Sequence, residues 1–152
     1  MTDILEFRGP TRWLSNFHFA PIHQDGFIYP TNEHYYQANR SNNKEDHERI
    51  RLLPTPKEAM DAGCALIHDC KERSDWHDIK LGVMLQATLL KYTQHLDLTN
   101  KLLATGKGRL VEGNYWNDIF WGECPIGTGE NHLGKTIIKV RSILQRLRGD
   151  YV

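Results

Sequence analysis

The chain has 152 residues, which suits one domain, residues 1–152, with a single hydrophobic core. Its 19 basic and 19 acidic side chains cancel, which argues against a protein that coats nucleic acid or a membrane surface, although a local basic patch is compatible with neutrality. No apolar run is long enough to span a bilayer, and three cysteines without a CxxC spacing are typical of the reducing cytoplasm. The eight histidines are scattered, so the sequence predicts neither a metal site nor another cofactor.

Helices dominate the elements predicted along the chain. Thr31 is placed to cap one helix, and Thr55 with Pro56 and Glu58 forms a strong start signal for another. Gly106 suits the left-handed conformation that ends a helix. Helices are expected over about 31–40, 44–53, 56–67, 74–95, 97–105 and 131–148, short strands over 4–7, 26–29 and 109–112, and irregular structure over 14–17. The predicted fold class is a helix-rich α+β single domain with a few short strands.

The segment from Asp118 to Asn131 places a carboxylate, a large aromatic and a glycine-rich turn directly before an amphipathic helix. Asn131 suits the N-cap of that helix, and free N–H groups at a helix N-terminus favour an anion such as phosphate. Trp121, followed by Gly122, is suited to stack on a base or sugar, while Asp118 is suited to act on the bound group. A plain turn that contains Gly129, beside a core aromatic pair, would leave the same pattern.

Two lysines of the predicted long helix share one apolar face. At about 100° per residue, Lys80 and Lys91 point within roughly 20° of each other. Their sector also holds Trp76, Val83, Met84 and Ala87. The simpler interpretation is that each stem packs while the ammonium reaches the rim of the face. A lysine in a cleft would instead bind phosphate or carboxylate, or attack a carbonyl or the anomeric carbon of a sugar if burial lowers its pKa.

Three carboxylates are candidates for acid–base chemistry. Glu33 begins a helix and is followed by Tyr36 and Gln37, a grouping of acid, aromatic and amide that suits a polar planar ligand. Glu112 ends a predicted strand shortly before Asp118. Carboxylates that converge on one cleft can divide the roles of base and acid between them. Each could equally be structural, and Glu33 in particular would stabilise the dipole of its helix.

Short segments spread over nearly the whole chain form a recognisable set when they are taken in order and at their spacing. They are residues 14–17, 29–38, Trp76 with Lys80 and 83–84, 110–112, 118–122, and Gly129, Asn131, 133–134 and Arg141. From Phe7 to Arg141 this set resembles the NADAR (YbiA-like) family. The resemblance implies a compact, mostly helical domain that acts on compounds derived from ADP-ribose or phosphoribose.

The resemblance further implies a metal-independent N-glycosidase. Members of the family cleave riboflavin-pathway intermediates between ribose phosphate and the pyrimidine amine, or remove ADP-ribose from guanine bases. The implied catalytic residues are Glu33 and Asp118 as carboxylates and Lys80 or Lys91 as an amine. The implied substrate contacts are Ser15, Asn16, Phe17, Tyr36, Arg40, Trp121, Gly122, Gly129 and Asn131.

Arg40 departs from the family, which often has a lysine at this position, and a guanidinium cannot act as a nucleophile at neutral pH. The departure leaves room for an alternative function, a non-catalytic module that binds ADP-ribose. The partner would be a small-molecule substrate or ADP-ribosylated DNA or RNA, and the sequence carries no indication of an oligomeric state. A nucleic acid would need a basic surface. The last predicted helix offers one, or simply a solvated face, with Lys135, Lys139, Arg141, Arg146 and Arg148.

Overall fold

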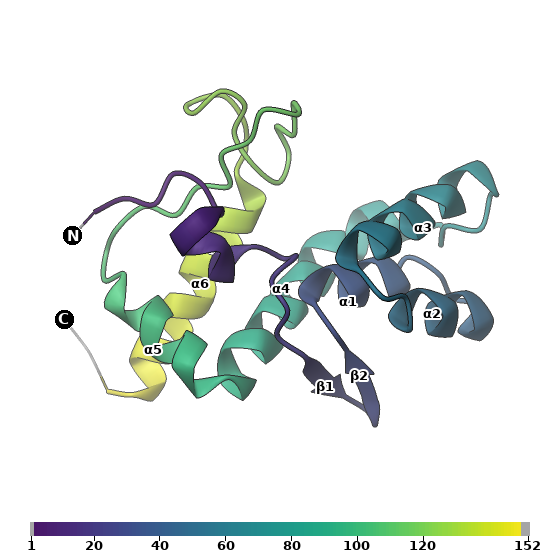
Figure 1. Ribbon diagram of the computed structural model, residues 1–152, viewed down its shortest axis with the longest axis horizontal. Coiled ribbons are helices and arrows are strands. Elements are labelled where there is room, and N and C mark those ends of the chain that lie inside the picture. The colour runs from purple at the N-terminus through teal and green to yellow at the C-terminus, as the bar shows by residue number, and fades with distance from the viewer. Residues whose placement is uncertain (1, 150–152) are drawn as a thin grey trace. The chain divides into compact units, whose positions relative to one another are not determined.

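The computed structural model describes residues 2–149 and shows a helix-rich α+β protein (Figure 1). Its elements are the 3₁₀ helix η1 (Gly9–Leu14), strands β1 (Ile22–Gln24) and β2 (Phe27–Tyr29), and helices α1 (Asn32–Ala38), α2 (Lys44–Arg51), α3 (Pro56–His68), α4 (Trp76–Gln94), α5 (Leu96–Ala104) and α6 (His132–Leu147). The predicted helix-rich α+β class is confirmed, while the single domain stays a prediction. Among the described residues, no helix is both long and apolar enough to cross a membrane.

The chain divides into two compact units. One, the hairpin unit, consists of Asn16–Lys91 and holds the β1–β2 hairpin, helices α1 to α3 and most of α4. The other, the terminal unit, combines Met1–Ser15 with Tyr92–Val152 and holds η1, α5 and α6. Each unit has its own buried side chains.

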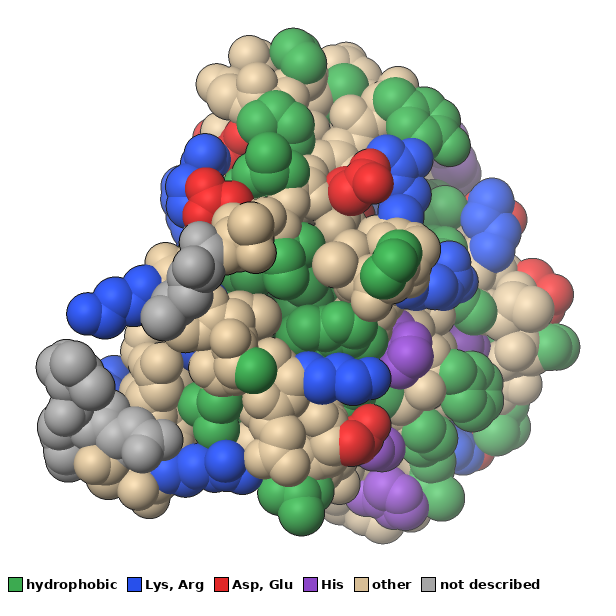
Figure 2. Space-filling model, turned by 60° about the vertical axis from the view of Figure 1, so that its left-hand side comes forward, with side chains coloured by type: hydrophobic (Ala, Val, Ile, Leu, Met, Phe, Trp, Pro, Cys, Tyr) green, Lys and Arg blue, Asp and Glu red, His purple; other side chains and the backbone are tan. Residues whose placement is uncertain are grey.

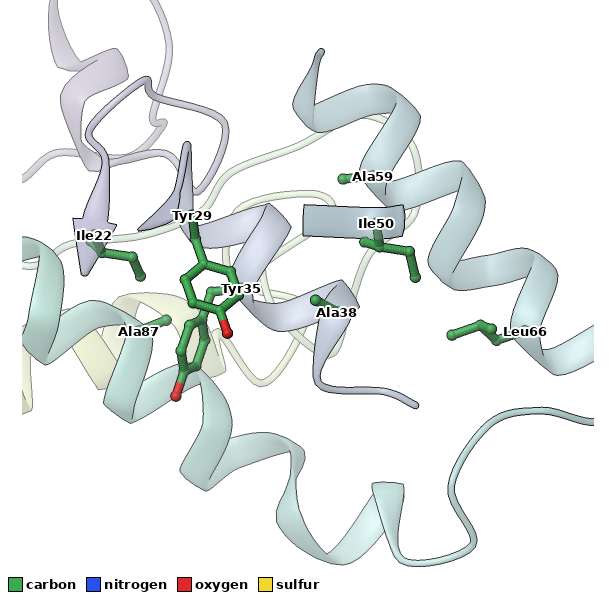
Figure 3. Packing of buried hydrophobic residues seen from close by; sticks show 8 residues of the cluster. All are labelled: Ile22, Tyr29, Tyr35, Ala38, Ile50, Ala59, Leu66 and Ala87. Atoms are coloured by element: carbon green, nitrogen blue, oxygen red, sulfur yellow. The ribbon is translucent and has the colours of Figure 1, made fainter. Parts of the chain in front are cut away.

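Helix α1 lies at the centre of the hairpin unit and packs against α2, α3 and β2. Figure 3 shows its Tyr35 and Ala38 among buried side chains from the hairpin and the neighbouring helices. The rings of Tyr29 and Tyr35 meet edge to face, with 4.9 Å between centroids. The core cluster consists of Ile22, Tyr29, Tyr35, Ala38, Ile50, Ala59, Leu66 and Ala87. Because α1 is surrounded in this way, its polar residues are carried into the interior as well.

The helix starts predicted from local sequence are confirmed. Thr31 accepts a hydrogen bond from the backbone N–H of His34, and Thr55 accepts one from the N–H of Glu58. These bonds satisfy donors that the first turn of a helix leaves free. The predicted strand at 26–29 is also present, as β2, but its partner β1 was not predicted.

In the terminal unit, α6 packs on α5, and α6 has a buried apolar face. That face consists of Leu133, Ile137, Val140 and Leu144. The strands predicted over 4–7 and 109–112 were wrong: these segments meet only at one parallel bridge, between Ile4 and Leu110. After this bridge the chain continues to η1, which the sequence pattern did not predict.

The basic surface predicted for α6 needs one correction. Arg141 is only 4% exposed, and its guanidinium donates to Thr105 Oγ1 at 2.7 Å and to the Gly108 carbonyl at 3.0 Å. Burial lowers the pKa of Arg141. The other three basic residues of the helix, Lys135, Lys139 and Arg146, are exposed, and so is Arg148 at its C-cap. On the face drawn in Figure 2, Lys and Arg side chains are scattered among Asp, Glu and His rather than gathered into one field.

Candidate functional site

Glu33 lies in the first turn of α1 and is 7% exposed. Its backbone N–H donates to the Asn16 carbonyl at 3.2 Å, and its carboxylate Oε1 accepts from Gln37 Nε2 at 2.7 Å. A buried carboxylate is costly unless charged or polar groups face it. The structure therefore places this predicted catalytic residue in the interior of the hairpin unit rather than on a solvated helix end.

A row of four linked side chains extends from the first turn of α1 past the end of α3: Glu33, Gln37, Arg40 and Glu72. Gln37 Oε1 accepts from Arg40 NH1 at 3.0 Å, and Arg40 NH2 pairs with Glu72 Oε2 at 3.1 Å. Arg40 is 8% exposed and lies over the ring of Trp76, with Cζ 5.6 Å from the ring centroid. Its charge is thus already compensated, which favours a structural link over the substrate contact predicted from the sequence.

The ring of Trp76 also meets Tyr36, at 4.9 Å between centroids and an interplanar angle of 61°. Both rings are buried. Tyr36 therefore belongs to the apolar wall beside the row from Glu33 to Glu72. Tyr36 was predicted from the sequence to contact the substrate, and in the structure its ring contacts the ring of Trp76.

Two asparagines flank the start of α1. Asn16 Nδ2 lies 3.4 Å from Met84 Sδ, and Asn32 Nδ2 lies 3.4 Å from Asn16 Oδ1. Asn32 is 1% exposed, and its Oδ1 has no hydrogen-bond partner among residues 2–149. Sequence reasoning missed Asn32, although its place directly before Glu33 was a usable signal. Phe17 is half-buried nearby in the sequence, whereas Ser15 belongs to the terminal unit and follows η1.

The two lysines of α4 differ in burial. Lys91 is 1% exposed, and burial lowers its pKa from 10.5 to about 7. Its ammonium therefore does not reach a solvated rim, which rules out the simpler interpretation for this residue. Lys80 is half-buried. A lowered pKa favours the neutral amine, which is the form that can act as a nucleophile.

Asp118 belongs to the terminal unit and shapes the loop before α6. Its Oδ1 accepts from the backbone N–H groups of Phe120 at 3.1 Å and Trp121 at 2.9 Å. Asn114 brackets the same turn, because its Nδ2 donates to the Asp118 carbonyl at 2.8 Å and its Oδ1 accepts from the Asp118 N–H at 3.0 Å. Half-buried Trp121 meets Phe120 edge to face at 5.0 Å.

The expected anion site at the start of α6 is not supported by the geometry. Asn131 is at the N-cap position, but it has φ 50° and makes no capping hydrogen bond with its side chain. Instead its Oδ1 accepts from the Glu112 N–H at 3.0 Å and its Nδ2 donates to the Leu110 carbonyl at 2.9 Å. The N–H groups of His132 and Leu133 donate to loop carbonyls at 3.1 and 3.0 Å, so these first-turn donors are occupied.

The glycines of this loop allow backbone segments to approach closely. A Cβ on Gly122 would lie 2.0 Å from the Glu112 carbonyl oxygen. Gly129 has φ 136°, and a Cβ there would lie 2.4 Å from the Gly122 carbonyl oxygen. Both glycines therefore build the loop that carries Trp121. Among residues 2–149, no three His, Cys, Asp or Glu residues gather so as to hold a metal ion.

Comparison with known proteins identifies the relatives of this chain. The model of the NADAR domain matches residues 6–145. N-glycosidase YbiA of Escherichia coli (strain K12) is 37% identical over 133 residues, which cover 86% of this chain and 80% of that protein. A riboflavin biosynthesis protein of Vibrio vulnificus (strain YJ016) is 35% identical over 137 residues, which cover 88% of this chain and 35% of that protein.

The fold has a solved counterpart. The NMR structure of the E. coli protein YbiA matches with a TM-score of 0.86 and 32% sequence identity, over 100% of this chain and 91% of that one. Identity at this level with named N-glycosidases supports an enzyme of the N-glycosidase class. Since the NADAR model spans nearly all of the described residues, the chain belongs to the NADAR family.

Proposed function

We propose that the protein hydrolyses the N-glycosidic bond of a phosphoribosyl or ADP-ribosyl compound without a metal ion. The reaction breaks the bond between C1 of ribose and a base nitrogen, forms a bond from C1 to a water oxygen, and returns a proton to the base. The observation that carries the proposal is Glu33, a buried carboxylate held by Gln37 in a member of a family with named N-glycosidases.

Glu33 has the properties that this reaction needs. Positive charge develops on the ribose ring as the base departs, and a carboxylate in a site of low dielectric stabilises it strongly. The same group can take the proton of the attacking water. The Gln37 amide donates to one carboxylate oxygen, which favours the ionised form that both roles require.

Lys91 offers a second route to the same products. A neutral amine would bond to C1 while the base leaves with a proton, and ring opening would give an imine that water hydrolyses to the free sugar and lysine. Burial, which lowers the pKa of Lys91 to about 7, supports this role. Lys80 and Asp118 remain predicted catalytic residues, although the hydrogen bonds of Asp118 to its own loop also suit a structural role.

The structure supports some of the predicted substrate contacts more than others. Trp121, half-buried on its loop, is suited to stack on the base, and Asn16 lies beside the start of α1, where it accepts from the Glu33 N–H. Ser15 and Phe17 flank Asn16 in the chain. Gly122, Gly129 and Asn131 contribute mainly by building the loop.

Two substrates test the proposal. One is a phosphoribosylamino-pyrimidine, suggested by the riboflavin biosynthesis relative, and the other is a DNA oligonucleotide with ADP-ribosylated guanine. Purified protein with chelator would be incubated with each, and released base and sugar separated by chromatography. Release from the first alone indicates a small metabolite as substrate, and release from the second indicates modified nucleic acid. Binding of ADP-ribose without any release would replace the proposal with the binding module.

The role of Glu33 is tested by Glu33→Gln, which keeps the size and removes the charge. We expect kcat to fall by about 100-fold or more, the usual cost of losing a general base. Glu45→Gln is the matched control, because Glu45 occupies the same first-turn position of α2 but is exposed. Full activity of Glu33→Gln would refute the assignment.

A further inference from the structure

Gln37 links Glu33 to a cation that is itself anchored. Its Nε2 donates to Glu33 Oε1 at 2.7 Å, and its Oε1 accepts from Arg40 NH1 at 3.0 Å. Glu33, Gln37 and Arg40 are all buried. At the far end, Arg40 NH2 pairs with Glu72 Oε2 at 3.1 Å, and the side chains of that pair are 10% and 15% exposed.

Only one orientation of the Gln37 amide satisfies both neighbours. A guanidinium has donors and no acceptor, so Arg40 requires the amide oxygen on its side. The NH₂ group must then face Glu33, which can accept at Oε1 only if that oxygen carries no proton. Arg40 therefore fixes the orientation of the amide, and the amide N–H in turn holds the Oε1 of Glu33 in one position.

Helix α3 supplies the space for this arrangement. A Cβ on Gly63 would lie 1.8 Å from Gln37 Oε1 and 2.6 Å from its Cδ. Gly63 is buried in the interior of α3, where glycine weakens a helix relative to alanine. Gly63 thus leaves room for the Gln37 side chain, although helix propensity disfavours a glycine at this position.

We propose that Gln37 is a positioning residue for the catalytic carboxylate of Glu33, that Arg40 orients its amide, and that Gly63 provides the space for it. This inference rests on the proposed function, since it assigns Glu33 its partner in that reaction. Arg40 then acts through Gln37 rather than by binding phosphate, and the replacement of the family's frequent lysine by arginine is compatible with catalysis.

The first test moves Gln37 without changing any member of the row. Gly63→Ala should displace the end of the Gln37 side chain and lower kcat by about 10- to 100-fold, the scale expected when a catalytic group shifts by about 1 Å. KM should stay within about twofold, because ground-state contacts are unchanged. Gly82→Ala is the control: Gly82 lies in α4, and apart from its chain neighbours and its own helix backbone no described atom lies within 4 Å of an added Cβ.

A second test separates orientation from charge. Gln37→Met and Arg40→Met should each lower kcat, while Arg40→Lys should restore part of it, since an ammonium still donates to the amide oxygen but lacks the fork that reaches Glu72. Arg51→Met is the matched control. Arg51 also pairs with a glutamate, Glu48, and lies over an aromatic ring in the hairpin unit.

A double-mutant cycle distinguishes positioning from structural damage. In the Glu33→Gln background, Gln37→Met should cost no further activity, because the carboxylate that it positions is gone. Equal fractional losses in both backgrounds, or wild-type kcat in Gly63→Ala with intact folding by circular dichroism, would overturn the inference while leaving the proposed function standing. If Glu33→Gln is itself fully active, the proposed role of Glu33 fails, and the inference fails with it.

Discussion

Replacing the buried Lys91 by methionine should change how the stability of the protein depends on pH. Methionine keeps the length of the side chain and removes the charge. In the folded state burial lowers the pKa of Lys91 from 10.5 to about 7. Between these values the unfolded chain holds a proton that the folded chain has released, so the free energy of unfolding rises with pH. At about 1.4 kcal/mol per pKa unit, the rise amounts to about 3 kcal/mol between pH 7 and pH 9.5.

Urea unfolding of the wild type and of Lys91→Met at intervals over this range measures the effect. The wild type should become more stable as the pH rises, whereas the variant should lack this slope and be the more stable protein at pH 7. The range ends below pH 10 because burial raises the pKa of Tyr29 to about 12 and raises that of Tyr92 as well. Those tyrosines ionise first in the unfolded chain, which lowers stability at higher pH in both proteins.

Lys135→Met is the control, since Lys135 is exposed on α6 and its replacement should keep the wild-type slope. Parallel stability curves for the wild type and Lys91→Met would refute the reasoning. They would show that Lys91 is charged in the folded state, and the route through a neutral amine would then lose its support.

Two further outcomes follow from buried polar contacts. Asn131→Asp removes the donor to the Leu110 carbonyl and should lower the free energy of unfolding, measured with urea, by about 1–3 kcal/mol. Asn43→Asp is the control and should be nearly neutral, because Asn43 is an exposed N-cap where only an acceptor is needed. Equal losses of stability in the two variants would contradict this expectation. Burial also lowers the pKa of His34 below 6.5, so the unfolded chain takes up a proton first and stability should fall as the pH drops below 6.5. An NMR titration of His34 with an ordinary midpoint would contradict that expectation.

Local signals in the sequence were sufficient for most of the helices. Thr31 and Thr55 start their helices through hydrogen bonds that span only three residues, so the sequence alone specifies them. The shared sector of Lys80 and Lys91 likewise follows from helical periodicity. The single domain, the catalytic roles and the substrate remain predictions. The resemblance to the NADAR family rests on several motifs in order rather than on any one residue.

Contacts between distant segments could not be read from the sequence. The segments around Ile4 and Leu110 have the pattern of strands, yet they meet at a single bridge, because pairing depends on where the rest of the chain turns. Asn131 has the composition of a cap and instead joins its helix to residues 110–112. Arg141 is charged but buried, since carbonyl and hydroxyl acceptors happen to surround it.

In the candidate site, too, some features follow from local sequence and others only from the packing of distant segments. The sequence determined that Glu33, Gln37 and Arg40 lie at spacings of four and three residues, and so on one side of a helix and its end. Only the tertiary structure brought Gly63 against the Gln37 amide and Glu72 against Arg40. Local hydrogen bonds and periodicity act within a few residues, whereas burial and charge compensation depend on which segments the fold packs together, and those decide what a carboxylate can do.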